Sequence, residues 1–118
     1  PGLRLSGDRD RLYHLFRNLL ENAVNCSQAG SIRILARHSG REVVVSVADE
    51  GRGIESGYLE RIFDRHFQRY PSEAGTGIGL TLCRKIAQLH GGRIWAESGG
   101  RGKGMTVHVA LPVRASRR

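Results

Sequence analysis

Cysteine, aromatic residues and long apolar runs are all scarce in this 118-residue sequence. The two cysteines, Cys26 and Cys83, lack the spacing of a metal site, and we expect both to be free, buried thiols in a reducing compartment. No apolar run approaches the roughly 20 residues that a membrane-spanning helix needs, and no signal peptide begins the chain. The length predicts one domain with a substantial apolar core. Because the chain opens on Pro1 rather than Met, we expect it to be a fragment of a longer protein.

Acidic residues are also few, with 11 against 19 basic residues and a formal net charge of +8. Such a balance raises the question of a polyanionic partner. Three of the arginines, however, lie in the tail after Val113, and no basic helix with interleaved aromatic residues is present. Nucleic-acid binding is therefore disfavoured.

The segment Arg9 to Ser27 has the pattern of a strong amphipathic helix, with Asp8 at the N-cap position. Its apolar residues recur at helical spacing: Leu12, Leu15, Phe16, Leu19, Leu20 and Ala23. A second row, Asn18, Asn22 and Asn25, lies on a different face. Three asparagines destabilise a helix by about 2 kcal/mol relative to alanine. The row is either a merely polar face or a surface that holds a hydrated metal and phosphates.

The rest of the chain predicts strands and shorter helices around two glycine-rich loops. Strands are expected at 31–38, 42–48, 93–98 and 105–111, with a short edge strand at 3–5, and helices at 56–63 and 79–90. Asp49 to Ile54, D-E-G-R-G-I, follows a buried strand and is either a plain turn or a loop for close approach of a ligand. Gly75 to Gly79 opens onto a helix N-terminus, an arrangement that favours phosphate.

These segments resemble, in order, the conserved boxes of sensor histidine kinases. N-L-L-E-N-A-V-N resembles the N box, D-E-G-R-G-I the G1 box, I-F-D-R-H-F-Q-R the F box and G-T-G-I-G-L the G2 box. The segments H-G-G-R-I-W-A-E-S and G-M-T-V-H-V-A-L-P resemble the closing strands. The chain, from about Leu3 to Pro112, therefore resembles the catalytic, ATP-binding domain of a two-component histidine kinase. The histidine kinases belong to a wider group that also includes gyrase B, the mismatch-repair ATPases and the heat-shock chaperone ATPases.

The resemblance implies a Bergerat ATP-binding fold. This is a two-layer α/β (α+β) sandwich, in which a mixed, mostly antiparallel five-stranded sheet carries about three helices on one face. Residues 1–113 would form the domain, and residues 114–118 a basic, disordered tail.

The resemblance also implies a site for ATP and Mg²⁺. Asp49 would accept a hydrogen bond from the adenine amino group, Asn22 would ligate magnesium, and Arg69 could reach the γ-phosphate. Glu21 could accept the proton of an attacking histidine. The other residues implied to line the nucleotide are Asn18, Asn25, Gly51, Gly53, Ile54, Phe63, Gly75, Gly77, Gly79, Leu80 and Thr106.

The sequence departs from the family pattern at two places. Asn25 and Cys26 stand where the family often has Lys and Tyr, and the lid segment from Arg69 to Ala74 is short. The first change predicts weaker nucleotide affinity, and the short lid predicts that exclusion of water from the triphosphate depends on a partner.

The family transfers the γ-phosphate to a histidine on a separate dimerisation domain, and from there to a response regulator. None of the five histidines here is followed by an acidic residue, as family acceptors typically are. We therefore expect a monomeric domain that binds Mg-ATP without phosphorylating itself. The resemblance implies a bacterial cytoplasmic location, with a parent protein that is either soluble or anchored to a membrane. Two alternatives stay open: a nucleotide-sensing module that acts by contacts alone, and an ATPase or serine kinase of the same wider group.

Overall fold

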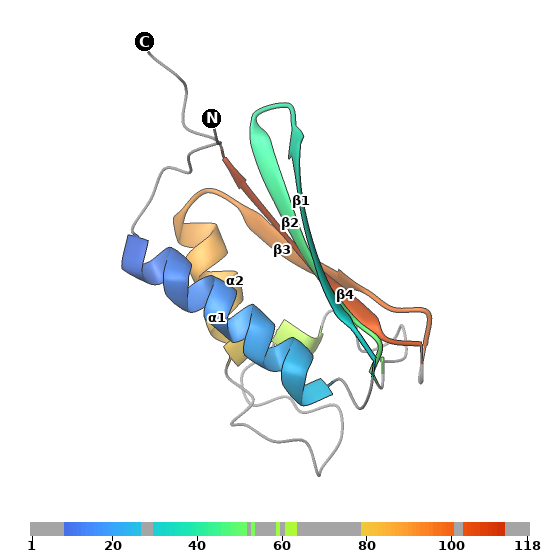
Figure 1. Cartoon of the computed structure of the whole chain (residues 1–118). Coiled ribbons are helices and arrows are strands. Elements are labelled where there is room, and N and C mark those ends of the chain that lie inside the picture. The colour runs from blue at the N-terminus through green and yellow to red at the C-terminus, as the bar shows by residue number, and fades with distance from the viewer. Residues whose placement is uncertain are drawn as a thin grey trace.

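The computed structural model describes residues 9–26, 30–51, 53, 59, 61–63, 79–100 and 103–112. Within these ranges the chain forms two layers, with both α-helices lying on one face of a twisted sheet (Figure 1). The helices are α1 (Arg9–Cys26) and α2 (Gly79–Leu89), and a short 3-10 helix, η2, spans Arg61–Phe63. The strands are β1 (Ile32–Ser39), β2 (Glu42–Asp49), β3 (Arg93–Glu97) and β4 (Met105–Pro112). The α/β sandwich implied by the sequence is confirmed.

The described sheet has four strands in the order β1-β2-β4-β3, and every pairing is antiparallel. The predicted hairpin of β1 and β2 is confirmed, with its turn at Gly40 (φ 60°). The fifth strand expected at 3–5 lies outside the described residues. The helix expected at 56–63 has only its last part described, and that part is the single 3-10 turn η2.

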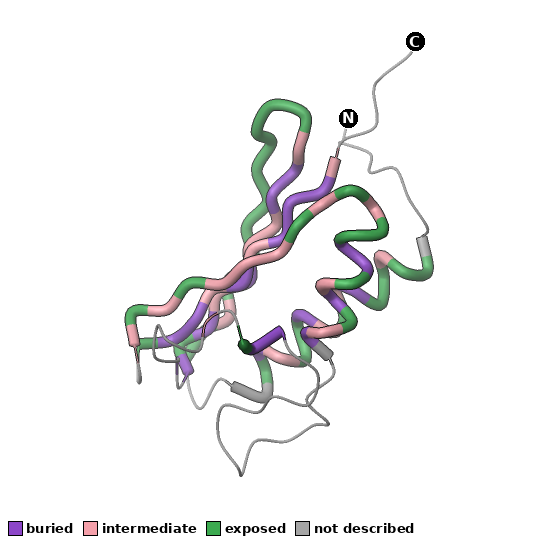
Figure 2. The backbone as a smooth tube through the Cα atoms, turned by 180° about the vertical axis from the view of Figure 1, so that it is seen from behind, coloured by how far each residue is buried: buried purple, intermediate pink, exposed green. Residues whose placement is uncertain are grey.

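The core lies between the helices and the sheet, where Figure 2 shows the buried segments facing one another. Leu15, Leu19 and Ala23 of α1 are no more than 2% exposed, as the apolar spacing predicted. Alternate residues of β4, including Val107 and Val109, complete this core from the sheet. None of the described helices combines the length and apolar character needed to cross a lipid bilayer.

Helix α2 ends where Gly91-Gly92 was predicted to stop it. The Gly92 N–H donates to the Ala87 carbonyl (2.8 Å) and the Gly91 N–H to the Gln88 carbonyl (3.0 Å), which is a Schellman cap. Gly91 adopts φ 76°, which glycine accommodates without strain. The cap turns the chain directly into β3.

Cys83 joins the two helices, because its fully buried thiol donates a hydrogen bond to the Leu15 carbonyl of α1 (3.4 Å). Burial raises the pKa of the Cys83 thiol from 9.0 to about 12. The expectation of a free, buried thiol is thus confirmed for Cys83; the side chain of Cys26 lies outside the described residues.

The raised pKa makes Cys83 unreactive in the folded protein. In a Cys26→Ser background, we expect labelling by a thiol reagent at pH 8 to be at least about 100 times slower in the native chain than in denaturant. Because the unfolded thiol ionises first, the free energy of unfolding should fall by roughly 1.4 kcal/mol per pH unit above pH about 9. The additional variant Cys83→Ala should lack this component of the slope. Equal labelling rates in native and unfolded chains would contradict the buried position.

Candidate functional site

Most segments singled out from the sequence meet at one end of the two layers. The C-terminal end of α1, the end of β2, η2 and the start of α2 lie together at the lower end of the view in Figure 1. The chain enters β4 from the same end, because Met105 pairs with Asp49 in the register of β2 and β4. Residues distant in sequence are thereby brought into one region.

Asp49 is the one charged residue that is buried in the described part of the chain, with 7% of its surface exposed. Its Oδ1 accepts a hydrogen bond from the Gly51 N–H at 2.9 Å. Burial raises the pKa of Asp49, although backbone hydrogen bonds from Gly51 and Met105 act in the opposite direction. Burying a carboxylate at the end of a core strand costs free energy of desolvation. A carboxylate with such a perturbed pKa is typical of a functional site.

The turn after Asp49 packs directly against the connection between β3 and β4. The Gly104 N–H donates to the Gly51 carbonyl (3.1 Å). A Cβ atom on Gly53 (φ 64°) would lie 2.2 Å from the Gly100 carbonyl oxygen, and one on Gly104 (φ 73°) would lie 2.3 Å from the Asp49 carbonyl oxygen. Both positions therefore require glycine because the two backbone segments are in contact.

Thr106 is not brought together with Asp49. It pairs with Ala48, and side chains on a strand alternate between faces, so Thr106 lies on the face opposite Asp49. Met105 is the residue beside Asp49, and its backbone hydrogen-bonds the carboxylate. The predicted place of Thr106 at the adenine end stays a prediction.

Helix α1 carries three different surfaces. Asn18 and Asn22 are half-buried on one flank of its core stripe, consistent with the expected row. Asn22 has hydrogen-bonding or electrostatic contacts within the chain. Glu21 lies on the outer side, where its carboxylate pairs with Arg17 Nε at 3.1 Å, and both side chains are more than half exposed.

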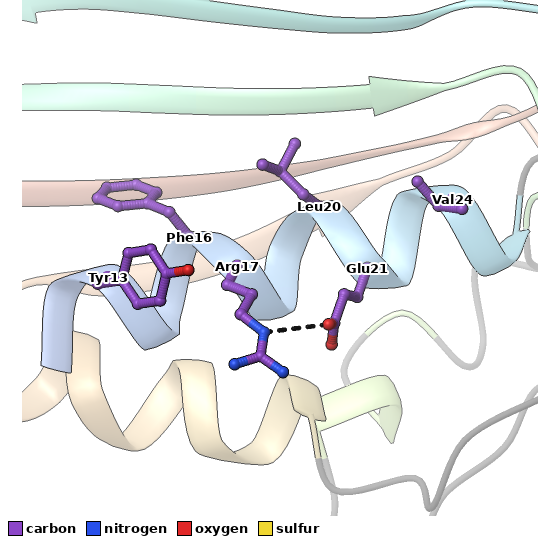
Figure 3. Close-up of a pocket in the computed structure, with 6 residues that line it drawn as sticks. All are labelled: Tyr13, Phe16, Arg17, Leu20, Glu21 and Val24. Atoms are coloured by element: carbon purple, nitrogen blue, oxygen red, sulfur yellow. Dashed lines mark hydrogen bonds and ion pairs between the residues drawn. The ribbon is translucent and has the colours of Figure 1, made fainter. Parts of the chain in front are cut away.

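The other flank of α1 borders an apolar groove of about 690 Å³. Its lining consists of Tyr13, Phe16, Leu20 and Val24 with the Arg17–Glu21 pair. Figure 3 shows Phe16 and Leu20 pointing toward the strands, and the ion pair pointing away from them. This groove contains neither the asparagines nor Asp49, so it is not the predicted site.

Phe63 and Leu80 belong to the core, with 4% and 8% exposure. The Thr81 hydroxyl donates to the Phe63 carbonyl (2.8 Å), and the Arg84 guanidinium lies 6.0 Å from the centre of the Phe63 ring. The start of α2 is therefore fixed to η2.

Several predicted site residues lie outside the described residues: Ile54, Arg69, Gly75 and Gly77. Asn25 and Gly79 are described as backbone only. The described part of the chain holds no group of three or more His, Cys, Asp or Glu side chains that could bind a metal.

The sequence did not single out Ser98 or Gly104 as site residues. Gly104 contacts the Asp49 turn through its backbone N–H, which donates to the Gly51 carbonyl, and the Ser98 side-chain hydroxyl donates to the Gly104 carbonyl. The only sequence signal was the glycine-rich turn at 99–104.

The two-layer fold has counterparts among histidine kinases of known structure. The mycobacterial sensor histidine kinase MprB has the same fold, with a TM-score of 0.88 and 24% identity over 97% of this chain and 80% of that one. The nucleotide-free catalytic domain of histidine kinase ThkA gives a TM-score of 0.80 with 35% identity, covering 93% of this chain and 71% of that one.

Sequence comparison agrees. The profile of the histidine kinase-, DNA gyrase B-, and HSP90-like ATPases matches residues 7–115. The alginate biosynthesis sensor protein KinB of Pseudomonas aeruginosa is 41% identical over 93% of this chain, and the adaptive-response sensory kinase SasA of Synechocystis sp. is 42% identical over 90%. The chain belongs to this ATPase family, as a catalytic domain of the histidine kinase type. It spans 18% of the length of KinB and 28% of that of SasA.

Proposed function

We propose that this domain binds Mg-ATP and donates its γ-phosphate to a histidine on a separate dimerisation domain of the same parent kinase, which then supplies a response regulator. The observation that carries the proposal is Asp49, a buried carboxylate in a glycine turn at the end of β2. We place this chemistry in the bacterial cytoplasm.

At the base end, Asp49 accepts a hydrogen bond from the amino group of adenine. Its Oδ1 accepts from the Gly51 N–H and the carboxylate also accepts from the Met105 backbone, and a carboxylate has further lone pairs that would accept from the adenine amino group. Gly53 and Gly104 let the Asp49 turn and the connection between β3 and β4 pack against each other, which fixes the backbone beside the proposed position of the base. Full-length ShkA, 28% identical and with a TM-score of 0.85 over 100% of this chain and 25% of that one, was solved in complex with AMPPNP.

At the phosphate end, the half-buried amides of Asn18 and Asn22 fit a hydrated cation, because amide oxygens are hard ligands. In the absence of a carboxylate cluster among the described residues, Asn22 would hold Mg²⁺ together with phosphate oxygens and water. The bound Mg²⁺ would neutralise phosphate charge. The start of α2 at Gly79 offers backbone N–H groups to the phosphates, and Arg69 contributes a further cation.

Glu21 is proposed as the residue that accepts the proton of the attacking imidazole. Its carboxylate is exposed and paired with Arg17, so it is accessible to an incoming domain.

The isolated chain should not phosphorylate itself. His90 donates from Nδ1 to the Ile86 carbonyl (2.8 Å), and His108 has both ring nitrogens in contact, with Ser46 Oγ and Glu97 Oε1, each at 2.7 Å. After incubation with labelled Mg-ATP, we expect no acid-labile phosphate on the chain alone. Labelled chain in that assay would contradict the proposed division between catalytic and acceptor domains.

The proposal is tested in two steps: calorimetry measures nucleotide binding, and a second assay measures transfer of the γ-phosphate to a histidine. Wild-type chain should bind Mg-ATP at least about tenfold more tightly than Mg-GTP. Guanine has a carbonyl oxygen in place of the adenine amino group that Asp49 would recognise. Added histidine-bearing domain of a matched kinase should then become labelled. Binding without transfer would favour a sensing module, and steady phosphate release without an acceptor would favour an ATPase. No binding of Mg-ATP would refute the proposed function.

A further inference from the structure

Ser98 lies at the end of β3, beside the turn that holds Asp49. Its Oγ is 2.7 Å from the Gly104 carbonyl oxygen and 3.3 Å from the Gly100 carbonyl oxygen, and it accepts from the Gly100 N–H at 3.1 Å. A hydroxyl has one proton to donate, so the short contact to Gly104 is the principal donated bond. Ser98 therefore fixes the residue immediately before β4.

Gly104 transmits that restraint to the carboxylate turn. Its carbonyl is held by Ser98, and its N–H donates to the Gly51 carbonyl at 3.1 Å. Gly51 in turn donates to Asp49 Oδ1 at 2.9 Å. Three successive hydrogen bonds thus connect the Ser98 hydroxyl to the Asp49 carboxylate.

Close packing makes this connection stiff. A Cβ atom on Gly53 would lie 2.9 Å from the Gly104 oxygen and 3.0 Å from Ser98 Oγ, so the two loops are in contact without intervening space. Buried hydrogen-bond chains of this kind hold a geometry more firmly than separate bonds do.

We propose that Ser98 is a positioning residue for recognition of the nucleotide base. It sets the place of Gly104 and, through Gly51, the direction of the Asp49 carboxylate, without touching the base itself. This inference rests on the proposed function, because it assigns Asp49 to the adenine.

A role of Ser98 in base recognition and a role in turn stability alone predict different results for a Ser98 variant. If Ser98 only stabilises the turn, its loss lowers the melting temperature and leaves base preference unchanged. If it aims Asp49, its loss weakens adenine nucleotides selectively. The ratio of the dissociation constants for Mg-GTP and Mg-ATP distinguishes the two roles.

The test uses Ser98→Ala and Ser98→Thr, with Ser39→Ala on the exposed end of β1 as the matched control. Dissociation constants come from competition against a fluorescent ATP analogue, and folding is checked by far-ultraviolet circular dichroism. We expect Ser98→Ala to weaken Mg-ATP about tenfold and Mg-GTP by no more than about twofold. Ser98→Thr, which keeps the hydroxyl, should restore the wild-type ratio to within about twofold, and Ser39→Ala should leave it unchanged.

An unchanged ratio in folded Ser98→Ala would overturn the inference while leaving the proposed function intact. Failure of wild-type chain to bind Mg-ATP would instead refute the proposed function. If Ser98→Ala does not fold, the same ratio of dissociation constants is measured for Ser98→Cys, because a thiol is a weaker hydrogen-bond donor of similar shape. It should reduce the ratio about threefold, and an unchanged ratio there would likewise overturn the inference.

Discussion

Replacing Asp49 by asparagine is expected to weaken Mg-ATP binding by at least about 100-fold. Asp49 Oδ1 is engaged by the Gly51 N–H at 2.9 Å, so the single oxygen of an asparagine would occupy that position. Its NH2 group would then face the adenine amino group, and two donors cannot bond one another. Calorimetry with Mg-ATP measures the loss.

The same variant should fold at least as well as the wild type when no nucleotide is present. Burial raises the pKa of Asp49, which means that the charged carboxylate opposes folding at neutral pH. A neutral side chain of the same shape removes that penalty. Asp10→Asn, an identical change at an exposed position in the first turn of α1, is the control and should retain binding. Tight Mg-ATP binding by Asp49→Asn would remove the central support for the proposed function.

Gly104→Ala should lower the free energy of unfolding by at least about 3 kcal/mol and eliminate nucleotide binding. The new Cβ would lie 2.3 Å from the Asp49 carbonyl oxygen and 3.2 Å from the Glu50 Cα, so the two loops must separate. Positive φ at this position (73°) adds backbone strain for any residue with a side chain. Thermal or urea denaturation measures the stability, and calorimetry at low temperature measures binding by the fraction that remains folded.

Gly40→Ala is the matched control for this experiment. Gly40 has nearly the same backbone strain, with φ 60°, but a Cβ there meets nothing within 4 Å. Its substitution should destabilise the chain by about 1 kcal/mol and leave Mg-ATP affinity unchanged. Equal effects of the two substitutions would mean that strain alone, and not contact between the loops, explains the requirement for Gly104.

Periodic segments were predicted well because their patterns are local. The apolar spacing of α1 identifies the helix and its buried face, and the runs rich in β-branched residues in β2 and β4 identify strands, without reference to the rest of the chain. Gly91-Gly92 likewise marks the end of α2 through a local cap. The segment ending at Phe63 was predicted to be helical, but its described part is a 3-10 turn whose end is fixed by Thr81, a contact made only in the folded chain.

The sequence predicted those residues of the candidate site that are adjacent to one another in one strand and the loop that follows it. Asp49 and its glycines follow a strand directly, so their sequence shows both the acid and the turn. Ser98 and Gly104 reach the same place through pairing of β2 with β4, which no local pattern reveals. The position of Met105 beside Asp49 has the same origin, since the register of two separated strands decides which side chain lies there.

Helix α1 is a single continuous helix, so its core stripe, its asparagine flank and the side that lines the apolar groove lie at fixed angles to one another. Each residue of an α-helix turns the chain by about 100°. Inserting or deleting a single residue between Leu19 and Asn22 would therefore swing Asn22 away from its flank while Leu15 and Leu19 stay anchored in the core. Evolution can exchange side chains along this helix, but we expect length changes in it to be confined to its two ends.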